Sequence, residues 1–513
     1  MQENIINTNK IDKFLKKLTF FCFLAFPISL VAGPLIAEIT MNTMSIIFLY
    51  YLSKKKNFFF FKEIFFKIFI LFYIYILISS IFSVYAKDII YKNFFYFRYV
   101  LFVYAIAYLL LNNKNIILLF YKVLLLTVFL VSIDGYIQYL LGTNLIGMVQ
   151  NIRVDRVSGL FGDQLILGSY ISRLLPLLVG LFFYNFKVLK FREVLFGLTA
   201  ILFSLIVVAI SGERMALITT LLYFLAITFF INFAKRIKVM IIFLVFMFLS
   251  LLFLFSPPLF SRHYNQTIDQ VNFKLSEKNF FSNFMYYSEI YNTAYNGFLD
   301  KKIIGQGPNS FRFFCSNPKL ISTKEILTVL HFDNLLLDKI LIEKVYISEN
   351  QKIKKGDILF SYLVNDNRIN FIAEDDFVIS FSNLTYVTAG NYISPKKIDI
   401  KVKKYRNGCT THPHNFYLQL LSETGIIGFC FIFLIFCYFF YLIIKFIYFS
   451  LLKKKKILSN LQISLVIGFI IFLLPIIPNG NFFNNWLNMI MFFPLGFYIF
   501  SLNENKNKKL YVE

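Results

Sequence analysis

The stretch Asn115-Ile-Ile-Leu-Leu-Phe-Tyr-Lys-Val-Leu-Leu-Leu-Thr-Val-Phe-Leu-Val-Ser-Ile133 decides the fold class of this chain. It is almost wholly apolar over the ~20 residues that an α-helix needs to cross a bilayer core of roughly 30 Å. Runs of this kind recur along the 513 residues, of which 58% are hydrophobic and only 16% are charged. In a soluble domain about a quarter of the residues are charged, so a soluble globule could not bury this much apolar surface. The sequence therefore predicts a polytopic membrane protein and excludes a soluble enzyme.

Twelve apolar runs are candidate membrane helices, although the second of them is short. They comprise residues 18–37, 38–52, 64–84, 94–111, 115–133, 165–185, 193–210, 215–232, 239–256, 419–445, 461–478 and 485–502. Basic clusters fall in the connections on one side only: Lys13, Lys16 and Lys17; Lys54 to Lys56; Lys187, Lys190 and Arg192; Lys235, Arg236 and Lys238; Lys453 to Lys456; and Lys506, Lys508 and Lys509. Such clusters mark the cytoplasmic side of a membrane protein. We therefore expect an all-α polytopic protein with about 12 transmembrane helices, both termini in the cytoplasm, and a first span that is retained as an anchor.

The net charge of +24 could also indicate a nucleic-acid-binding protein. The chain, however, has 41 Lys against 11 Arg, and most of the Lys lie in the short loops that orient membrane helices. We expect membrane lipids rather than nucleic acid as partners.

One outside segment is much longer than the others and divides the chain into three parts. Residues 1–256 hold nine spans, residues 257–418 form a large periplasmic loop, and residues 419–513 hold three spans and a cytoplasmic tail. Cys315 and Cys409 both lie in this loop, in what would be an oxidising compartment. A disulfide between these two residues and a pair of free thiols are both compatible with the sequence.

Within the loop, residues 345–393 alternate apolar and polar side chains around turns at Gly356 and Gly390, which predicts several short strands. The arrangement resembles a biotinyl/lipoyl-type barrel-sandwich. Carriers of that type hold a modified Lys on the hairpin between their halves, whereas the hairpin here, Asn365-Asp-Asn-Arg368, has no Lys. We therefore interpret this small β insert as a structural or docking module.

Four arginines lie on the outside half of the expected topology, where positive residues are disfavoured. They are Arg98, Arg156, Arg173 and Arg214. A guanidinium is a planar fork of donors that fits two phosphate oxygens at once, so this group suggests a site for a phosphorylated lipid headgroup. In the alternative interpretation, each arginine extends to the membrane interface or pairs with a carboxylate such as Glu213 or Asp134.

A second group of polar residues lies where the large loop returns to the membrane, in Thr411-His-Pro-His414-Asn415. An imidazole titrates near neutrality and is a natural general base at a membrane surface. Glu423 follows about two helical turns later and could orient that imidazole. The alternative is that the histidines only cap the helix or lie at the interface.

These motifs together resemble the O-antigen ligase/O-antigen polymerase family of bacterial envelope glycan transferases. The most specific match is His414-Asn415 followed by Gly425-x-x-Gly428, at the end of a large outside loop. Three further stretches fit the family: Ser211-Gly-Glu-Arg214, Arg156-Val-Ser-Gly-Leu-Phe-Gly-Asp163 and Ile304-Gly-Gln-Gly-Pro-Asn-Ser-Phe311. The departures are the β insert and the acidic Glu213 beside Arg214.

The resemblance implies a glycosyltransferase of the periplasmic leaflet of the bacterial inner membrane. Its donor would be a glycan on undecaprenyl diphosphate, and its acceptor would be a hydroxyl of lipid A–core. Two other acceptors are possible within this resemblance. One is a carrier-linked glycan, as in a polymerase, and the other is a protein Ser or Thr, as in a protein O-oligosaccharyltransferase. No carboxylate pair lies in an outside loop near the motifs, so we expect no metal and no cofactor.

The resemblance also implies roles for individual residues. The expected catalytic residues are His414 as general base, Glu423 as the residue that orients it, and Arg214. The diphosphate would bind Arg156 and Arg214, with support from Arg98 and Arg173, and the structural residues of the motifs are Asn415, Gly425, Gly428, Gly305 and Gly307. A flippase of lipid-linked glycan is the alternative that is not an enzyme, but it would need polar residues at mid-membrane, where the spans here are almost wholly apolar.

Overall fold

The computed structural model describes residues 2–510 except 57–58, 151–155, 232–237, 239–249, 251–262, 265–286, 331–339, 349, 365–366, 374–375, 383–391, 394–397, 399, 454 and 476. The chain divides into two compact units. The helical unit comprises Met1–Lys274, Ala294–Phe314 and Thr411–Glu513, and the β unit comprises Leu275–Thr293 and Cys315–Thr410.

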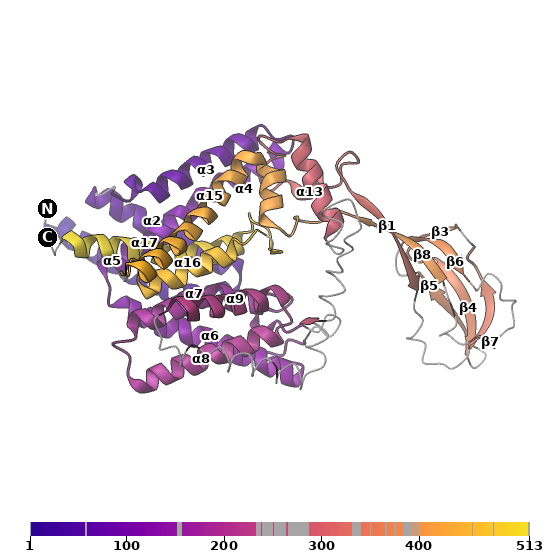
Figure 1. Cartoon of the computed structure of the whole chain (residues 1–513), viewed down its shortest axis with the longest axis horizontal. Helices are drawn as coiled ribbons and strands as arrows, with labels where there is room; N and C mark the ends of the chain where they lie inside the picture. The colour runs from indigo at the N-terminus through magenta and orange to yellow at the C-terminus, as the bar shows by residue number, and fades with distance from the viewer. Residues whose placement is uncertain are drawn as a thin grey trace. The chain divides into compact units, whose positions relative to one another are not determined.

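Long helices make up the helical unit (Figure 1). They are α1 (Gln2–Ala32), α2 (Pro34–Lys55), α3 (Ile64–Ile81), α4 (Ala86–Phe94), α5 (Arg98–Asn112), α6 (Ile116–Leu141), α7 (Leu167–Asn185), α8 (Phe191–Ile210), α9 (Arg214–Phe230), α15 (Phe416–Leu452), α16 (Asn460–Phe472) and α17 (Asn485–Leu510). Shorter helices are η1 (Phe59–Lys62), η2 (Phe95–Phe97), η4 (Gly159–Phe161) and α14 (Phe311–Phe314), while α13 (Ser288–Asp300) crosses the boundary between the units.

In the described residues, nine helical segments are long and apolar enough to span a membrane, and α9 and α16 are shorter apolar helices. The expected multi-pass helical membrane protein is therefore confirmed. The expected span 239–256 lies outside the described residues, so the number of 12 spans stays a prediction. The second span is longer than the sequence suggested, because Gly33 (φ 129°) breaks the helix and Pro34 then starts α2 at its first position, where a missing N–H costs nothing.

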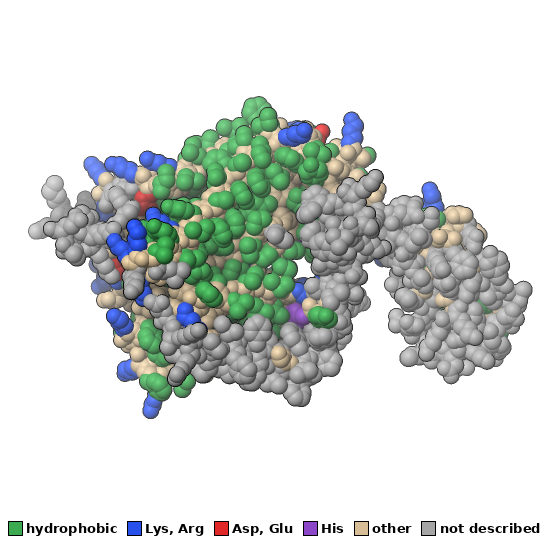
Figure 2. All heavy atoms as spheres, viewed as in Figure 1, with side chains coloured by type: hydrophobic (Ala, Val, Ile, Leu, Met, Phe, Trp, Pro, Cys, Tyr) green, Lys and Arg blue, Asp and Glu red, His purple; other side chains and the backbone are tan. Residues whose placement is uncertain are grey.

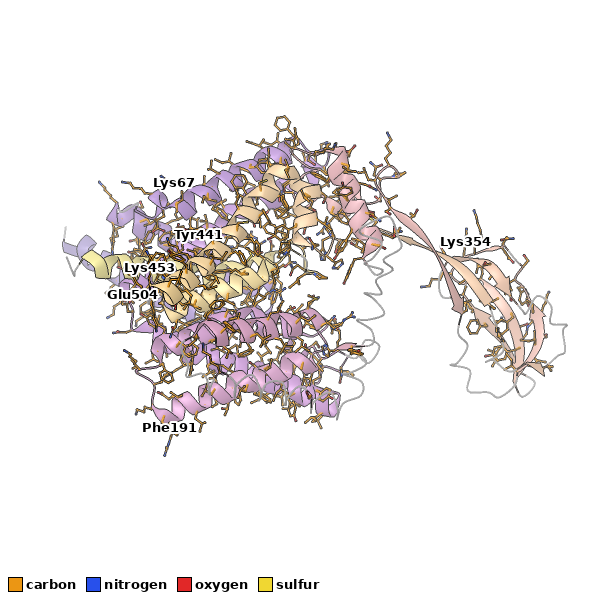
Figure 3. All side chains as sticks on the ribbon, in the orientation of Figure 1. Lys67, Phe191, Lys354, Tyr441, Lys453 and Glu504 are labelled. Carbon is orange, nitrogen blue, oxygen red and sulfur yellow. A yellow bond between two sulfur atoms is a disulfide. The ribbon has the colours of Figure 1, made fainter. Side chains whose placement is uncertain are left out.

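The helices run between two ends of the helical unit. Both termini lie at one end, here named the terminal end, where Lys114 Nζ is 2.9 Å from Glu504 Oε1 and Lys54 pairs with Asp12. Figure 3 shows Lys453 and Glu504 at this end. The opposite end, named the distal end, carries the α8–α9 turn, the start of α7 and the start of α15; there the Tyr170 hydroxyl of α7 donates to the Pro27 carbonyl of α1.

A continuous hydrophobic surface covers the middle of the helical unit, and Lys and Arg gather at the terminal end (Figure 2). Exposed apolar side chains such as Leu434 on α15 and Ile64 on α3 contribute to this surface. A broad exposed apolar band with charged ends is the surface of a protein that lies in lipid.

In its described residues, the β unit contains two four-stranded sheets, with strand orders β1-β8-β6-β3 and β5-β4-β2-β7. The strands are β1 (Thr323–Leu330), β2 (Ile340–Val345), β3 (Lys352–Ile353), β4 (Ile358–Val364), β5 (Asn367–Ile372), β6 (Phe377–Ser382), β7 (Tyr392–Ile393) and β8 (Ile400–Asn407). Ile342, Phe360, Ile379 and Val402 are among the buried residues that form its core.

The β unit is larger than the expected insert at 345–393, because β1 and β8 pair along their whole length from Thr323↔Asn407 to Leu330↔Ile400. Four Lys and Arg residues in β8 masked its alternating pattern, in which Ile400 and Val402 are buried. Cys315 and Cys409, which precede β1 and follow β8, form a disulfide. The first and last strands of the unit, β1 and β8, and the disulfide beside them therefore join the two ends of the same module.

Candidate functional site

The turn between α8 and α9 carries a buried carboxylate, Glu213, that joins several parts of the distal end. Its Oε1 accepts the backbone N–H of Gly168 at 2.7 Å, and its Oε2 accepts the backbone N–H of Ser169 at 3.2 Å. The Ser169 hydroxyl also donates to Oε2 at 2.5 Å. Glu213 thereby caps the first turn of α7, where backbone N–H groups have no partner within the helix.

Glu213 also interacts with two of the arginines, Arg156 and Arg173. Arg156 Nη2 lies 3.8 Å from Glu213 Oε2, and Arg156 also donates to the Leu165 carbonyl. Burial raises the pKa of Glu213, whereas the Ser169 hydrogen bond and the charges of Arg156 and Arg173 act in the opposite direction. Arg214 follows Glu213 directly and begins α9. Arg156 and Arg173 are therefore close enough for their charges to act on the Glu213 carboxylate, and Arg214 is the neighbour of Glu213 in sequence.

Arg173 lies one turn into α7 and lines a pocket of about 80 Å³ between α7, α9, α16 and α17. Its Nη1 donates to the Ser169 carbonyl at 3.1 Å, and its guanidinium lies over the Phe472 ring, 5.4 Å from the ring centroid. The Arg173 Nε and the Asn479 Nδ2 both line this pocket and are buried without a hydrogen-bond partner among the described residues. Two buried donors that are left unsatisfied within the protein indicate a site for a ligand with acceptor oxygens.

His414 is joined by its backbone to Asn479, a lining residue of this pocket in the loop between α16 and α17. The backbone N–H of Asn479 donates to the His414 carbonyl at 2.8 Å. His414 has a left-handed backbone (φ 57°), which is uncommon for a residue with a side chain and often marks a functional position. The next residue, Asn415, is the N-cap of α15: its Oδ1 accepts from Tyr417 and Leu418, and its Nδ2 donates to the Pro475 carbonyl at 2.7 Å. Asn415 thus ties the start of α15 to the same loop.

The two histidines of the motif contact each other, with ring centroids 4.1 Å apart. Burial, together with the charges of the His414 ring and the Arg312 guanidinium, lowers the pKa of His412 to about 3. Burial also lowers the pKa of His414 below its ordinary value near 6.5. His414 is therefore neutral at physiological pH, which is the form that a general base requires.

Glu423 is not placed as the sequence suggested. Its two carboxylate oxygens accept the backbone N–H groups of Asn309 and Phe311, each at 2.8 Å, and its Oε2 also accepts from Gln419 at 3.1 Å. No contact to a histidine is present among these described bonds. Glu423 holds the Ile304–Phe311 turn against α15, so its position supports a structural role rather than one in orienting His414.

The motif glycines allow the turn to approach α15 at a kink. Gly425 (φ 62°) interrupts the helix, and a Cβ on Gly305 would lie 2.4 Å from the Glu423 carbonyl carbon. The Gly307 N–H donates to the Glu423 carbonyl at 2.8 Å, and a Cβ on Gly428 would collide with Thr424. The glycines therefore allow close packing at the kink, Gly305 and Gly425 against backbone and Gly428 against the Thr424 side chain.

Arg98 lines a different pocket from Arg173. Its Nη2 is 3.1 Å from Glu38 Oε1 on α2 and 3.1 Å from the Tyr99 hydroxyl. The expected four-arginine group is therefore divided into Arg156, Arg173 and Arg214 on one side and Arg98 on another. Asn479 was missed by sequence reasoning, although the turn-forming Pro478-Asn479-Gly480 in a loop between two spans could have drawn attention to it.

The comparison with protein families bears on this site. Residues 199–341 match the family model described as O-antigen ligase. This match supports the resemblance of the chain to the O-antigen ligase/polymerase family. The matched range contains the Ser211–Arg214 turn and the Ile304–Phe311 turn, whereas Arg156 and His414 lie outside it. No curated protein matches the chain. The similarity to this family supports a glycan-transferring enzyme of ligase or polymerase type in a membrane.

Proposed function

We propose that the protein transfers a glycan from undecaprenyl diphosphate to an acceptor hydroxyl at the periplasmic leaflet of the bacterial inner membrane, most simply as an O-antigen ligase that acts on lipid A–core. The observation that carries this proposal is the pocket in which Arg173 and Asn479 present unsatisfied donors, with the Asn479 N–H bonded to the His414 carbonyl. Its apolar walls, such as Phe469 and Met491, suit the first part of a polyprenyl chain, and its donors suit a diphosphate. The basic clusters at the terminal end support a distal end that faces the periplasm.

The chemistry requires two kinds of help. The acceptor oxygen attacks the anomeric carbon of the donor sugar, and the bond from that carbon to the diphosphate oxygen breaks with its electron pair on the diphosphate. Fixed cations lower the barrier by stabilising this developing charge, and we assign this role to Arg173, Arg214 and Arg156, the last of which pairs with Glu213. The acceptor hydroxyl loses its proton to His414, which is typically worth about 10²–10⁴-fold in rate.

The assay uses the purified full-length protein with an undecaprenyl-diphosphate-linked glycan, in the presence of EDTA. Lipid A–core and carrier-linked repeat units are offered separately. Growth of lipid A–core supports a ligase, and longer carrier-linked chains support a polymerase. Product that disappears in EDTA and returns with a divalent metal would contradict a metal-independent reaction.

The variant His414→Ala tests whether His414 is the general base of the transfer reaction. It should abolish product without changing the amount of protein. If product formation continued at the wild-type rate, His414 would not be the base. If the movement of lipid-linked glycan across the membrane still depended on the protein while no acceptor was ever extended, the flippase alternative would replace this proposal.

A further inference from the structure

A pocket of about 240 Å³ lies at the terminal end of the helical unit, between α1, α2 and α5. It shares no lining residue with the Arg173 pocket, which lies between other helices. Its charged lining residues are Lys16 and Lys55, here named the pocket lysines, so its formal charge is +2. The pocket therefore attracts anions at the end of the helical unit that is opposite to the start of α15.

The lining of this pocket changes from charged to apolar with depth. The pocket lysines lie toward its opening at the terminal end. Along α2 the lining extends inward from Lys55 to Met44, which is about 16 Å at a rise of 1.5 Å per residue. Along α5 it extends inward from Asn112 to Ala105, and Met44 and Ala105 are both buried. A charged opening above an apolar floor suits an amphiphile whose head carries negative charge.

The pocket lysines are not paired with carboxylates in the part of the chain that the structure describes. Instead, Lys16 Nζ lies 5.7 Å from the centroid of the Phe20 ring, and Lys55 Nζ lies 5.6 Å from the centroid of the Tyr108 ring. An ammonium group has three N–H donors, and a ring face occupies only one side of it. Both pocket lysines therefore keep N–H donors for the oxygens of a ligand.

The carboxylate of Asp12, which lies one turn before Lys16 on α1, is engaged outside the pocket. It pairs with Lys54, and the Tyr50 hydroxyl donates to its Oδ1 at 3.2 Å. The backbone carbonyl of Asp12 accepts from the Tyr51 hydroxyl at 3.1 Å. Asp12 thus joins α1 to α2 beside the pocket and balances the charge of Lys54 rather than that of a pocket lysine.

The position of the pocket favours a lipid over a dissolved anion. Lys and Arg gather at the terminal end, next to the continuous hydrophobic surface, as expected where the headgroups of one leaflet lie (Figure 2). Anionic phospholipids give this layer a negative potential, and basic pockets between membrane helices bind their phosphates. A dissolved anion would gain nothing from the apolar floor, whereas a phospholipid supplies both a phosphate and a hydrocarbon chain.

We propose that this pocket binds an anionic phospholipid of the leaflet at the terminal end. Its phosphate binds the two pocket lysines, and the upper part of one acyl chain lies on the floor formed by Met44, Phe48 and Leu109. The lipid contacts α1, α2 and α5 at once and so stabilises their packing. The inference does not depend on the proposed transfer reaction, because the residues assigned to transfer do not line this pocket.

The test measures the binding of radiolabelled phosphatidylglycerol to the purified full-length protein in a neutral detergent. In about 1 M salt, charges more than about 3 Å apart are largely screened, so diffuse attraction to the basic surface is suppressed. We expect saturable binding that excess unlabelled phosphatidylglycerol displaces. Diacylglycerol, which lacks the phosphate, and inorganic phosphate, which lacks the chains, should not displace it at the same concentration.

Variants assign the binding to the pocket. Lys16→Gln and Lys55→Gln should each weaken it by about 10-fold, as expected when a charge-assisted hydrogen bond is lost, and Lys55→Arg, which keeps the charge, should stay within about threefold of the wild type. Lys17→Gln is the matched control, since Lys17 is exposed beside Lys16 but does not line the pocket, and it should bind as the wild type does. Thermal unfolding shows that each variant is folded, and the lipid should raise the unfolding temperature of the wild type and of Lys17→Gln more than that of the two pocket variants.

Three results would overturn the lipid site. They are an equal loss of binding in Lys17→Gln, which would indicate diffuse attraction to the basic surface; displacement of the lipid by an equal concentration of inorganic phosphate, which would indicate a site for a dissolved anion; and unchanged binding in folded Lys16→Gln and Lys55→Gln proteins. By contrast, a protein that binds the lipid as expected but extends no acceptor would refute the proposed function and leave this site in place.

Discussion

Replacing Arg173 by Gln should lower kcat for glycan transfer by about 10²–10³-fold, the usual loss when one fixed donor is removed from the charge that develops in a transition state. The guanidinium is held at the pocket by one hydrogen bond, 3.1 Å to the Ser169 carbonyl, and by the Phe472 ring at 5.4 Å. These two contacts are worth about 1–2 kcal/mol of stability, so the variant should still fold. The large effect is therefore expected on kcat and not on the amount of folded protein.

The assay measures kcat and both KM values for the purified variant, together with its thermal unfolding. Arg173→Lys keeps the charge but loses the planar fork, so it should keep more activity than Arg173→Gln. Lys67→Gln controls for the loss of one positive charge. A folded Arg173→Gln protein within threefold of the wild-type kcat would refute the assignment of this pocket to the diphosphate.

Three further predictions concern the remaining parts of the site. Because burial lowers the pKa of His414, its neutral form persists below pH 6.5; the acid limb of a pH profile of kcat/KM should lie below that value, and a midpoint above it would argue against His414 as the base. Glu423→Gln should lower the thermal stability by about 1–3 kcal/mol, since one of two backbone N–H partners is left unsatisfied; lost activity at unchanged stability would instead restore an orienting role for Glu423. Replacing residues 324–406 by a short Gly-Ser linker between Thr323 and Asn407, which are paired in register, should leave the helical unit folded and weaken transfer; unchanged transfer, measured in the same assay, would show that the β insert is dispensable.

Most of the fold could be predicted from the sequence, because its determinants are local. A run such as residues 115–133 must lie in lipid whatever its neighbours are, and the Lys clusters set the direction of each span. The positions of the motif residues that shape the backbone could also be identified from the sequence. Asn415 caps a helix through bonds to residues two and three positions later, and Gly425 breaks a helix by its own backbone angle.

The chain by itself thus determined a multi-pass helical protein with a β insert, and it indicated which arginines and histidines are candidates for a site. Only the tertiary structure decided how these residues are grouped. Arg98 pairs with Glu38, Arg156 with Glu213, and Glu423 with the backbone of Asn309 and Phe311, in each case across dozens of residues or more of sequence. No local pattern encodes such partners, because a buried charge takes whichever donor or acceptor the packing of helices brings to it.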